Sequence, residues 1–151
     1  MPDAPMPDAS ASVSSPNLTT VLQDADTIAV VGCSARPSRT SHQIAAYLQR
    51  HGYRIVPVNP NHDEILGEPC VPSLQDVPDD VTVDLVNIFR RPEHTAAMVR
   101  DAARYAETTG TTPVVWTQLG VSSPEAQQVA ADAGLPYVRN RCIKVEHAQR
   151  T

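Results

Sequence analysis

The chain has 151 residues, of which 41% are hydrophobic and only 4% aromatic, and it carries a formal net charge of −5 at pH 7. This length suits one domain whose core is built from Val, Ile, Leu and Ala. The acidic balance disfavours nucleic acid and anionic membranes as partners, and no apolar run approaches the ~20 residues of a membrane-spanning helix.

The first residues, MPDAPMPDASASVSSPN, are rich in Pro, Ala, Ser and Asp. They have neither the basic region nor the apolar core of a secretory signal, and they are too polar to bury a core of their own. We therefore expect a disordered tail over residues 1–16 and a folded domain over residues 17–151.

The cysteines, Cys33, Cys70 and Cys142, are odd in number and widely spaced. This pattern suggests neither a disulfide framework nor a zinc site. It fits the reducing cytoplasm, which is the expected location of the protein.

Apolar segments of helical and strand type alternate along the rest of the chain. A short helix is predicted over 17–25, a strand over 27–31, a helix over 41–50 and a strand over 53–60. A polar connection with one helical turn near 72–75 leads to a third strand over 83–89. A helix from 92 to about 106, a strand over 114–116, a helix over 124–133, a fifth strand within 135–140 and a final turn or helix over 143–147 complete the pattern. Pro57 indicates a strand near a sheet edge, or an early end to its pairing, because proline has no N–H to donate.

Five strands alternating with helices predict an α/β fold, a Rossmann-like, three-layer, doubly wound parallel sheet with right-handed crossovers. We expect the strand order 3-2-1-4-5, in which the chain reverses direction between strands 1 and 4. Ligands of such sheets bind at the reversal, outside the carboxyl ends of the strands. The loops that begin at Gly32, Asn59, Phe89, Trp116 and Val138 are therefore expected to carry function.

The loop after the first strand has the features of a phosphate site. Gly32 lets the backbone turn and approach a ligand, and the following helix start offers unpaired N–H groups. Ser34 and Ser41 can donate hydroxyl hydrogen bonds, while Arg36 and Arg39 can bind phosphate oxygens. The sequence favours phosphate binding here over an ordinary polar loop.

The same loop argues against NAD, because it has one glycine in place of the G-x-G-x-x-G fingerprint. The second strand ends in Asn59-Pro60 and lacks the acidic residue that would bind a free ribose diol. The pattern favours a ligand with a phosphorylated ribose, such as coenzyme A (CoA) or NADP. Arg90 and Arg91 fit either an anion contact or a solvated pair, and Trp116 fits either the core or a flat wall of the ligand crevice.

Five motifs in the same order resemble the small stand-alone CoA-binding proteins: VVGCSARPSRTSHQIAAYLQRHGYRIVPVNPN, ILGEPCVPSLQDVP, VDLVNIFRRPEH, VVWTQLGV and AGLPYVRNRCIKVEH. The single domain of that family is similar to the CoA-binding domain of the succinyl-CoA synthetase alpha subunit, and the resemblance runs from about Leu18 to the C-terminus. Thr117 and Asn140 depart from the pattern, which commonly has Leu and an acidic residue there. The ligand-binding residues that the resemblance implies are Gly32, Cys33, Ser34, Arg36, Pro37, Arg39, Ser41, Asn59, Pro60, Phe89, Arg90, Arg91, Trp116, Gln118 and Gly120.

No catalytic constellation can be assembled from the spacing of nucleophiles, bases and carboxylates, and the scattered acidic residues suggest no metal site. His42, at the start of the first long helix, is the best placed histidine. Cys142 follows Arg141 and lies two residues before Lys144. Nearby cations can lower the pKa of a thiol and make it reactive, and a mixed disulfide with the thiol of CoA is conceivable. The alternative is that Cys142 is an unreactive, partly buried side chain.

The leading hypothesis is a cytoplasmic protein that binds CoA or an acyl-CoA without catalysis of its own. Its phosphates would rest on the Gly32 loop with Arg36 and Arg39. The first alternative is an enzyme or redox module that uses NADP or an acyl-CoA with His42 or Cys142. The second is an interaction subunit that has lost its ligand, and a homodimer or an unidentified protein partner remains open.

Overall fold

The computed structural model describes residues 16–150, so the predicted tail over residues 1–16 lies almost wholly outside the described residues. One parallel sheet contains β1 (Thr27–Val31), β2 (Arg54–Val58), β5 (Leu85–Ile88), β6 (Val114–Thr117) and β7 (Tyr137–Val138). The helices are α2 (Leu18–Asp24), α3 (Thr40–Arg50), α4 (Pro92–Thr109), α5 (Pro124–Asp132) and α6 (Ile143–Gln149). A small antiparallel hairpin, β3 (Glu64–Ile65) and β4 (Glu68–Pro69), and a 3-10 turn, η1 (Leu74–Asp76), lie between β2 and β5.

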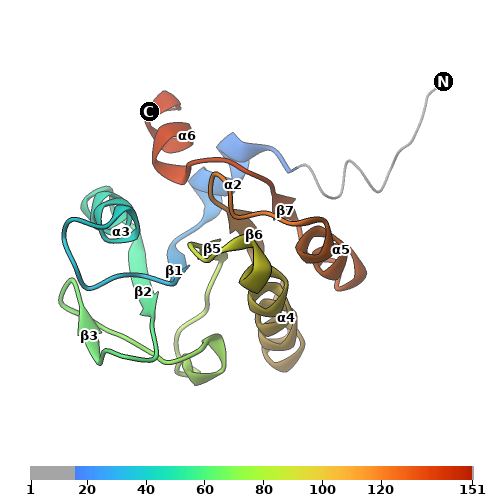
Figure 1. The fold of residues 1–151 in the computed structure, drawn as a ribbon, viewed down its shortest axis with the longest axis horizontal. Helices are drawn as coiled ribbons and strands as arrows, with labels where there is room; N and C mark the ends of the chain where they lie inside the picture. Colours follow the sequence, from blue (N-terminus) through green and yellow to red (C-terminus); the bar gives the residue numbers. More distant parts are fainter. Residues whose placement is uncertain (1–15, 151) are drawn as a thin grey trace.

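Helices cover both faces of the sheet (Figure 1), and an apolar core lies on each face. On one face α4 and α5 contribute Val99 and Ala126, which pack with Val86 of β5. On the other, α3 and α6 contribute Leu48 and Ile143. Both faces of the strands are therefore buried, which explains their unbroken apolar runs and confirms the three-layer α/β prediction. Within residues 16–150, no helix has the length and apolar character needed to cross a bilayer.

The strand order differs from the expected one. The sheet runs β2-β1-β5-β6-β7, which is 2-1-3-4-5 when these five strands alone are counted. The third strand of this sheet, β5, pairs with β1, with Ile28 opposite Leu85. The predicted order placed it on the outer side of β2, which was wrong. The chain therefore reverses direction between β1 and β5, so the crevice is expected between the loops that follow these two strands.

Pro57 supplies a physical reason for this order. The backbone carbonyl of Val58 accepts the Gly32 N–H, so the backbone groups of Val58 point toward β1. The backbone groups of its neighbour Pro57 therefore point toward the outer edge of β2. There the missing N–H of the proline removes no bond from the sheet. The Pro57 carbonyl accepts the N–H of Val71 at 3.1 Å, and the β2–β5 connection thereby covers the edge.

Candidate functional site

Gly32 brings the loops after β1 and β5 into direct contact. Its φ is +84°, and a Cβ at this position would lie 2.5 Å from the carbonyl oxygen of Phe89 and 3.2 Å from Cδ of Arg90. The Phe89 N–H donates to the carbonyl of Val31 at 2.8 Å. Glycine is therefore required both by the backbone conformation and by the close approach of the second loop.

The loop between β1 and α3 is held in shape by hydrogen bonds to its own hydroxyls and to the end of β2. The Ser34 N–H donates to Oγ of Ser41 at 2.9 Å, and the Arg36 N–H donates to Oγ of Ser34 at 3.1 Å. Nδ2 of Asn59 donates to the carbonyl of Cys33 at 2.9 Å. The loop is thus organised before any ligand arrives, which lowers the entropy cost of binding.

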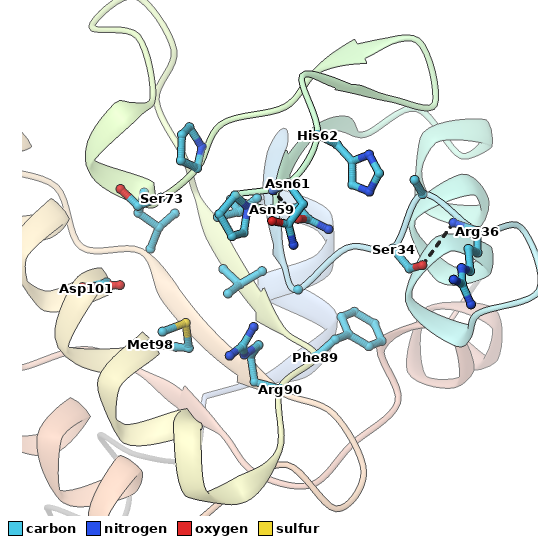
Figure 2. A pocket seen from close by; sticks show the side chains of 17 residues that line it. Ser34, Arg36, Asn59, Asn61, His62, Ser73, Phe89, Arg90, Met98 and Asp101 are labelled. Carbon is cyan, nitrogen blue, oxygen red and sulfur yellow. Dashed lines mark hydrogen bonds between the residues drawn. The ribbon is translucent and has the colours of Figure 1, made fainter.

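A cavity of about 600 Å³ opens beside this loop, between the ends of β1 and β2 and the side of α4. Figure 2 shows Arg90 projecting into it between Phe89 and Met98, with Arg36 on the far side of Ser34. Apolar walls and scattered hydrogen-bonding groups suit a flat, polar-edged ring. The remaining lining residues are Val31, Gly32, Ala35, Val58, Asn59, Pro60, Asn61, His62, Pro72, Ser73, Leu74 and Asp101.

A second cavity, of about 650 Å³, adjoins the first. It lies between the starts of α3 and α4 and the loop after β6. The two cavities share Gly32, Ser34, Arg36, Phe89 and Arg90, so they form one continuous cleft across the reversal point of the sheet. The second cavity alone is lined by Arg39, Thr40, Ser41, Arg91, Pro92, Gln118, Leu119, Gly120, Val121 and Cys142.

The cleft is positively charged although the whole chain is acidic. Arg36, Arg39, Arg90 and Arg91 line it, and none of their side chains forms an ion pair with another residue of the described part of the chain. Arg39 and Arg91 are the N-caps of α3 and α4, and neither helix start has a side-chain capping hydrogen bond. The unpaired N–H groups at the start of α3 and the positive dipole ends of both helices therefore add to the arginine charges and favour an anion there.

The structure brings most of the predicted site residues to this cleft. Gly32, Ser34, Arg36, Asn59, Pro60, Phe89 and Arg90 line the first cavity, and Arg39, Ser41, Arg91, Gln118 and Gly120 line the second.

Three predicted residues, Cys33, Pro37 and Trp116, line neither cavity. The Cys33 side chain is fully buried, and burial, with a smaller contribution from Cys70, raises its pKa to about 12. Trp116 is also fully buried, and its Nε1 donates to the carbonyl of Arg141 at 2.9 Å. Trp116 therefore belongs to the core and does not form a wall of the crevice.

The two positions that depart from the resembled family contact each other beside the second cavity. The Asn140 N–H donates to Oγ1 of Thr117 at 3.2 Å, and Oδ1 of Asn140 accepts the Gly120 N–H at 2.7 Å. Asn140 has a φ of +59°, a conformation that asparagine tolerates better than most residues. This pair fixes the shape of the β6 loop that lines the second cavity.

Sequence reasoning missed a group of residues in the first cavity. Pro72 and Leu74 arrive there because the connection pairs with the edge of β2, a contact that no local pattern announces. Met98 and Asp101 are three residues apart on α4, so their shared face was the available signal.

His42 lines neither cavity, whereas Cys142 lies in the wall of the second. Across residues 16–150, no group of three or more His, Cys, Asp and Glu side chains is placed to hold a metal ion.

Known proteins are similar to this chain in sequence and in fold. The uncharacterized protein YneT of Bacillus subtilis is 43% identical over 128 residues, which are 85% of this chain and 90% of YneT. A solved structure of a protein from Pyrococcus horikoshii is 36% identical, with a TM-score of 0.80, and the match covers 87% of this chain and 88% of that one. An ADP-forming acetate–CoA ligase II of Archaeoglobus fulgidus is 36% identical over 63 residues, which are 40% of this chain but 9% of the ligase.

A family model described as a CoA binding domain matches residues 26–148, almost the whole described chain. The match includes every strand of the parallel sheet and both cavities. It agrees with the resemblance that the five sequence motifs predict. The chain therefore belongs to the CoA-binding domain family.

Proposed function

We propose that this protein binds CoA or an acyl-CoA in the two-cavity cleft. The observation that carries the proposal is the presence in this cleft of four arginines without ion-pair partners among the described residues and of two helix starts without side-chain caps. Arg36 and Arg90 line both cavities, whereas Arg39 and Arg91 line the second. CoA is an elongated molecule with three phosphates, a nucleoside at one end and a flexible arm at the other. The positive charge lies where the cavities meet and in the second cavity, so it can hold the phosphates while the nucleoside occupies the first cavity.

The nucleoside end fits the first cavity. Pro60, Leu74 and Met98 give it apolar walls, and Asn59 and Arg90 stand at its edges. The phosphates then rest on the Gly32 loop, where Arg36 and Arg39 can bind their oxygens. The arm extends into the second cavity, along the loop after β6 and toward Cys142.

Calorimetric titration of the full chain with CoA, acetyl-CoA, NADP and NAD tests the proposal. We expect CoA or acetyl-CoA to bind more tightly than NADP, and NAD to bind most weakly because its ribose carries no extra phosphate. Tighter binding of NADP than of either CoA form would overturn the proposal. Absence of binding by all four would favour an interaction module without a nucleotide.

Arg39→Ala tests the place of the phosphates. The loss of one charge-assisted hydrogen bond is expected to weaken CoA binding by about 1.5–3 kcal/mol. Arg54→Ala is the matched control, because Arg54 is exposed at the start of β2, the opposite end of the sheet, and its loss changes the net charge equally. Equal effects of the two variants would remove Arg39 from the site.

A further inference from the structure

A buried polar network lies behind the second cavity. Asn87 is the one polar residue of β5, and it is fully buried. Its Nδ2 donates to Oε1 of Gln118 at 3.1 Å and to the carbonyl of Trp116 at 3.4 Å. Its Oδ1 is buried without a hydrogen-bond partner among residues 16–150. An unpaired buried acceptor destabilises a core relative to an apolar side chain, so stability alone does not explain an asparagine here.

The network fixes the orientation of the Gln118 amide. Oε1 of Gln118 accepts a second hydrogen bond, from the backbone N–H of Ile143 at 2.9 Å. A reversed amide would set its NH₂ group against this N–H and against Nδ2 of Asn87, and neither of these groups accepts a hydrogen bond. The carbonyl oxygen of Gln118 must therefore face the core, and Nε2 must face away from it.

Nε2 of Gln118 is a hydrogen-bond donor without an acceptor among the described residues. Gln118 is only 5% exposed, yet it lines the second cavity. No residue of the described chain accepts a hydrogen bond from Nε2, and this atom is not among the enclosed, unpartnered atoms of the core. It is accessible from the cavity.

We propose that Nε2 of Gln118 donates to an amide carbonyl of the CoA arm, and that Asn87 is a positioning residue that holds Gln118 in this orientation. The inference rests on the CoA binding proposed above. The arm of CoA contains two amides, and their carbonyls are neutral acceptors that a neutral amide donor can satisfy. Gln118 lines the second cavity, which the proposed function assigns to the arm, so the arm is the source of the acceptor there.

The test compares CoA with adenosine 3′-phosphate 5′-diphosphate, which keeps all three phosphates and lacks the arm. Gln118→Met removes the donor without adding charge. We expect this variant to bind CoA about tenfold more weakly, the cost of one hydrogen bond to a desolvated acceptor. The armless ligand is expected to bind the variant as it binds the natural protein.

Asn87→Leu tests the positioning role, with Asn87→Val as a second variant in case the first does not fold. Either is expected to weaken CoA binding and to leave the armless ligand unaffected. In ¹⁵N-labelled natural protein, the side-chain amide resonances of Gln118 should shift on addition of CoA and stay in place with the armless ligand. Tyr105→Phe is the matched control, because it removes a buried hydrogen bond, from the N–H of Val83, at a residue that lines neither cavity, and it should bind CoA as the natural protein does.

The outcomes separate the two proposals. If the natural protein binds neither ligand, the proposed function fails. If it binds both, and Gln118→Met weakens both equally or neither, the arm contact is refuted while nucleotide binding stands. If both Asn87 variants bind CoA as the natural protein does, or weaken both ligands equally, Asn87 has no positioning role.

Discussion

At the scale of single residues, Gly32 links the fold to the proposed site. Gly32→Ala carries two energetic costs, one for the left-handed backbone conformation and one for crowding against the second loop. A left-handed φ costs an alanine about 1–2 kcal/mol, and crowding against a neighbour adds about 1–3 kcal/mol. Gly67 has a similar φ, +76°, but a Cβ there would meet no atom within 4 Å. We therefore expect Gly32→Ala to lower the free energy of unfolding in urea by more than Gly67→Ala does.

Gly32→Ala is also expected to weaken CoA binding, because the carbonyl of Phe89 and the side chain of Arg90 must move. Equal losses of stability in the two variants would show that the close approach is relaxed at no cost.

Single residues also show where sequence reasoning succeeds and where it ends. The position of Gly32, Arg36 and Arg39 in the wall of the cleft was predictable because they follow the carboxyl end of a buried strand, whereas their role in binding stays a prediction. The burial of Cys33 and Trp116 was not, because both residues lie next to lining positions in the chain and only their packing sets them apart. Gln118 came from the resemblance alone, and nothing in the sequence connected it with Asn87.

At the scale of elements, the helix boundaries follow from local chemistry. Asn17 and Ser123 cap α2 and α5 with their side chains, and Pro92 stands in the first turn of α4, where proline is tolerated. The β3–β4 hairpin was missed, because each strand has two residues and too little length to show alternation. The helices and the strands of the parallel sheet were thus predictable from local patterns, whereas this short hairpin, which depends on its own pairing, was not.

The contact between α6 and α3 contains a buried histidine, His147, so we expect its stability to depend on pH. The hydroxyl of Tyr47 and Nδ1 of His147 are 2.8 Å apart, and the rings of His51 and Tyr53 lie against His147. Burial, and secondarily the charge of His51, lowers the pKa of His147 below its ordinary value of 6.5. Lys144 stands over the ring of Tyr47 and adds positive charge to the cluster. A proton added to His147 would place a positive charge in this buried cluster, close to Lys144 and His51.

The sign of the pH effect follows from the lowered pKa. The unfolded chain binds this proton more readily than the folded one, so the stabilisation is complete above pH 6.5 and declines as the pH falls toward the lowered folded value. His147→Gln keeps an acceptor and cannot protonate, so it should lose less Tm than the natural protein between about pH 7.5 and about pH 5.5. His94→Gln, at an exposed histidine of α4, is the control and should behave as the natural protein does. Parallel acid losses in all three proteins would exclude His147 as the cause.

At the scale of the whole molecule, the strand order was the part of the fold that the sequence left underdetermined. Alternating strands and helices specify a parallel sheet, but the 3-2-1-4-5 and 2-1-3-4-5 orders use the same elements. Pro57 was the residue that could have decided, because its missing N–H fits only an edge strand and the expected order placed that strand inside. The location of the cleft was nonetheless foreseeable, since the carboxyl ends of all the strands meet at one edge in either order. The partner of the Gly32 loop across the crevice was foreseeable only in the observed order.

The distribution of charge over the molecule leads to the last prediction. The chain has a formal net charge of −5, which repels CoA at long range, while the arginines of the cleft attract its phosphates at contact. Salt screens both effects, but the attraction acts over a few ångströms and is the larger, because Coulomb energy falls with distance. Raising the salt from about 0.05 M to about 0.5 M should therefore weaken CoA binding several-fold. Dephospho-CoA, which lacks the 3′-phosphate, should show a shallower salt dependence in the same titrations, because fewer of its charges meet arginine. Affinity that rises with salt would mean that the global repulsion dominates, and that the cleft arginines do not contact the phosphates.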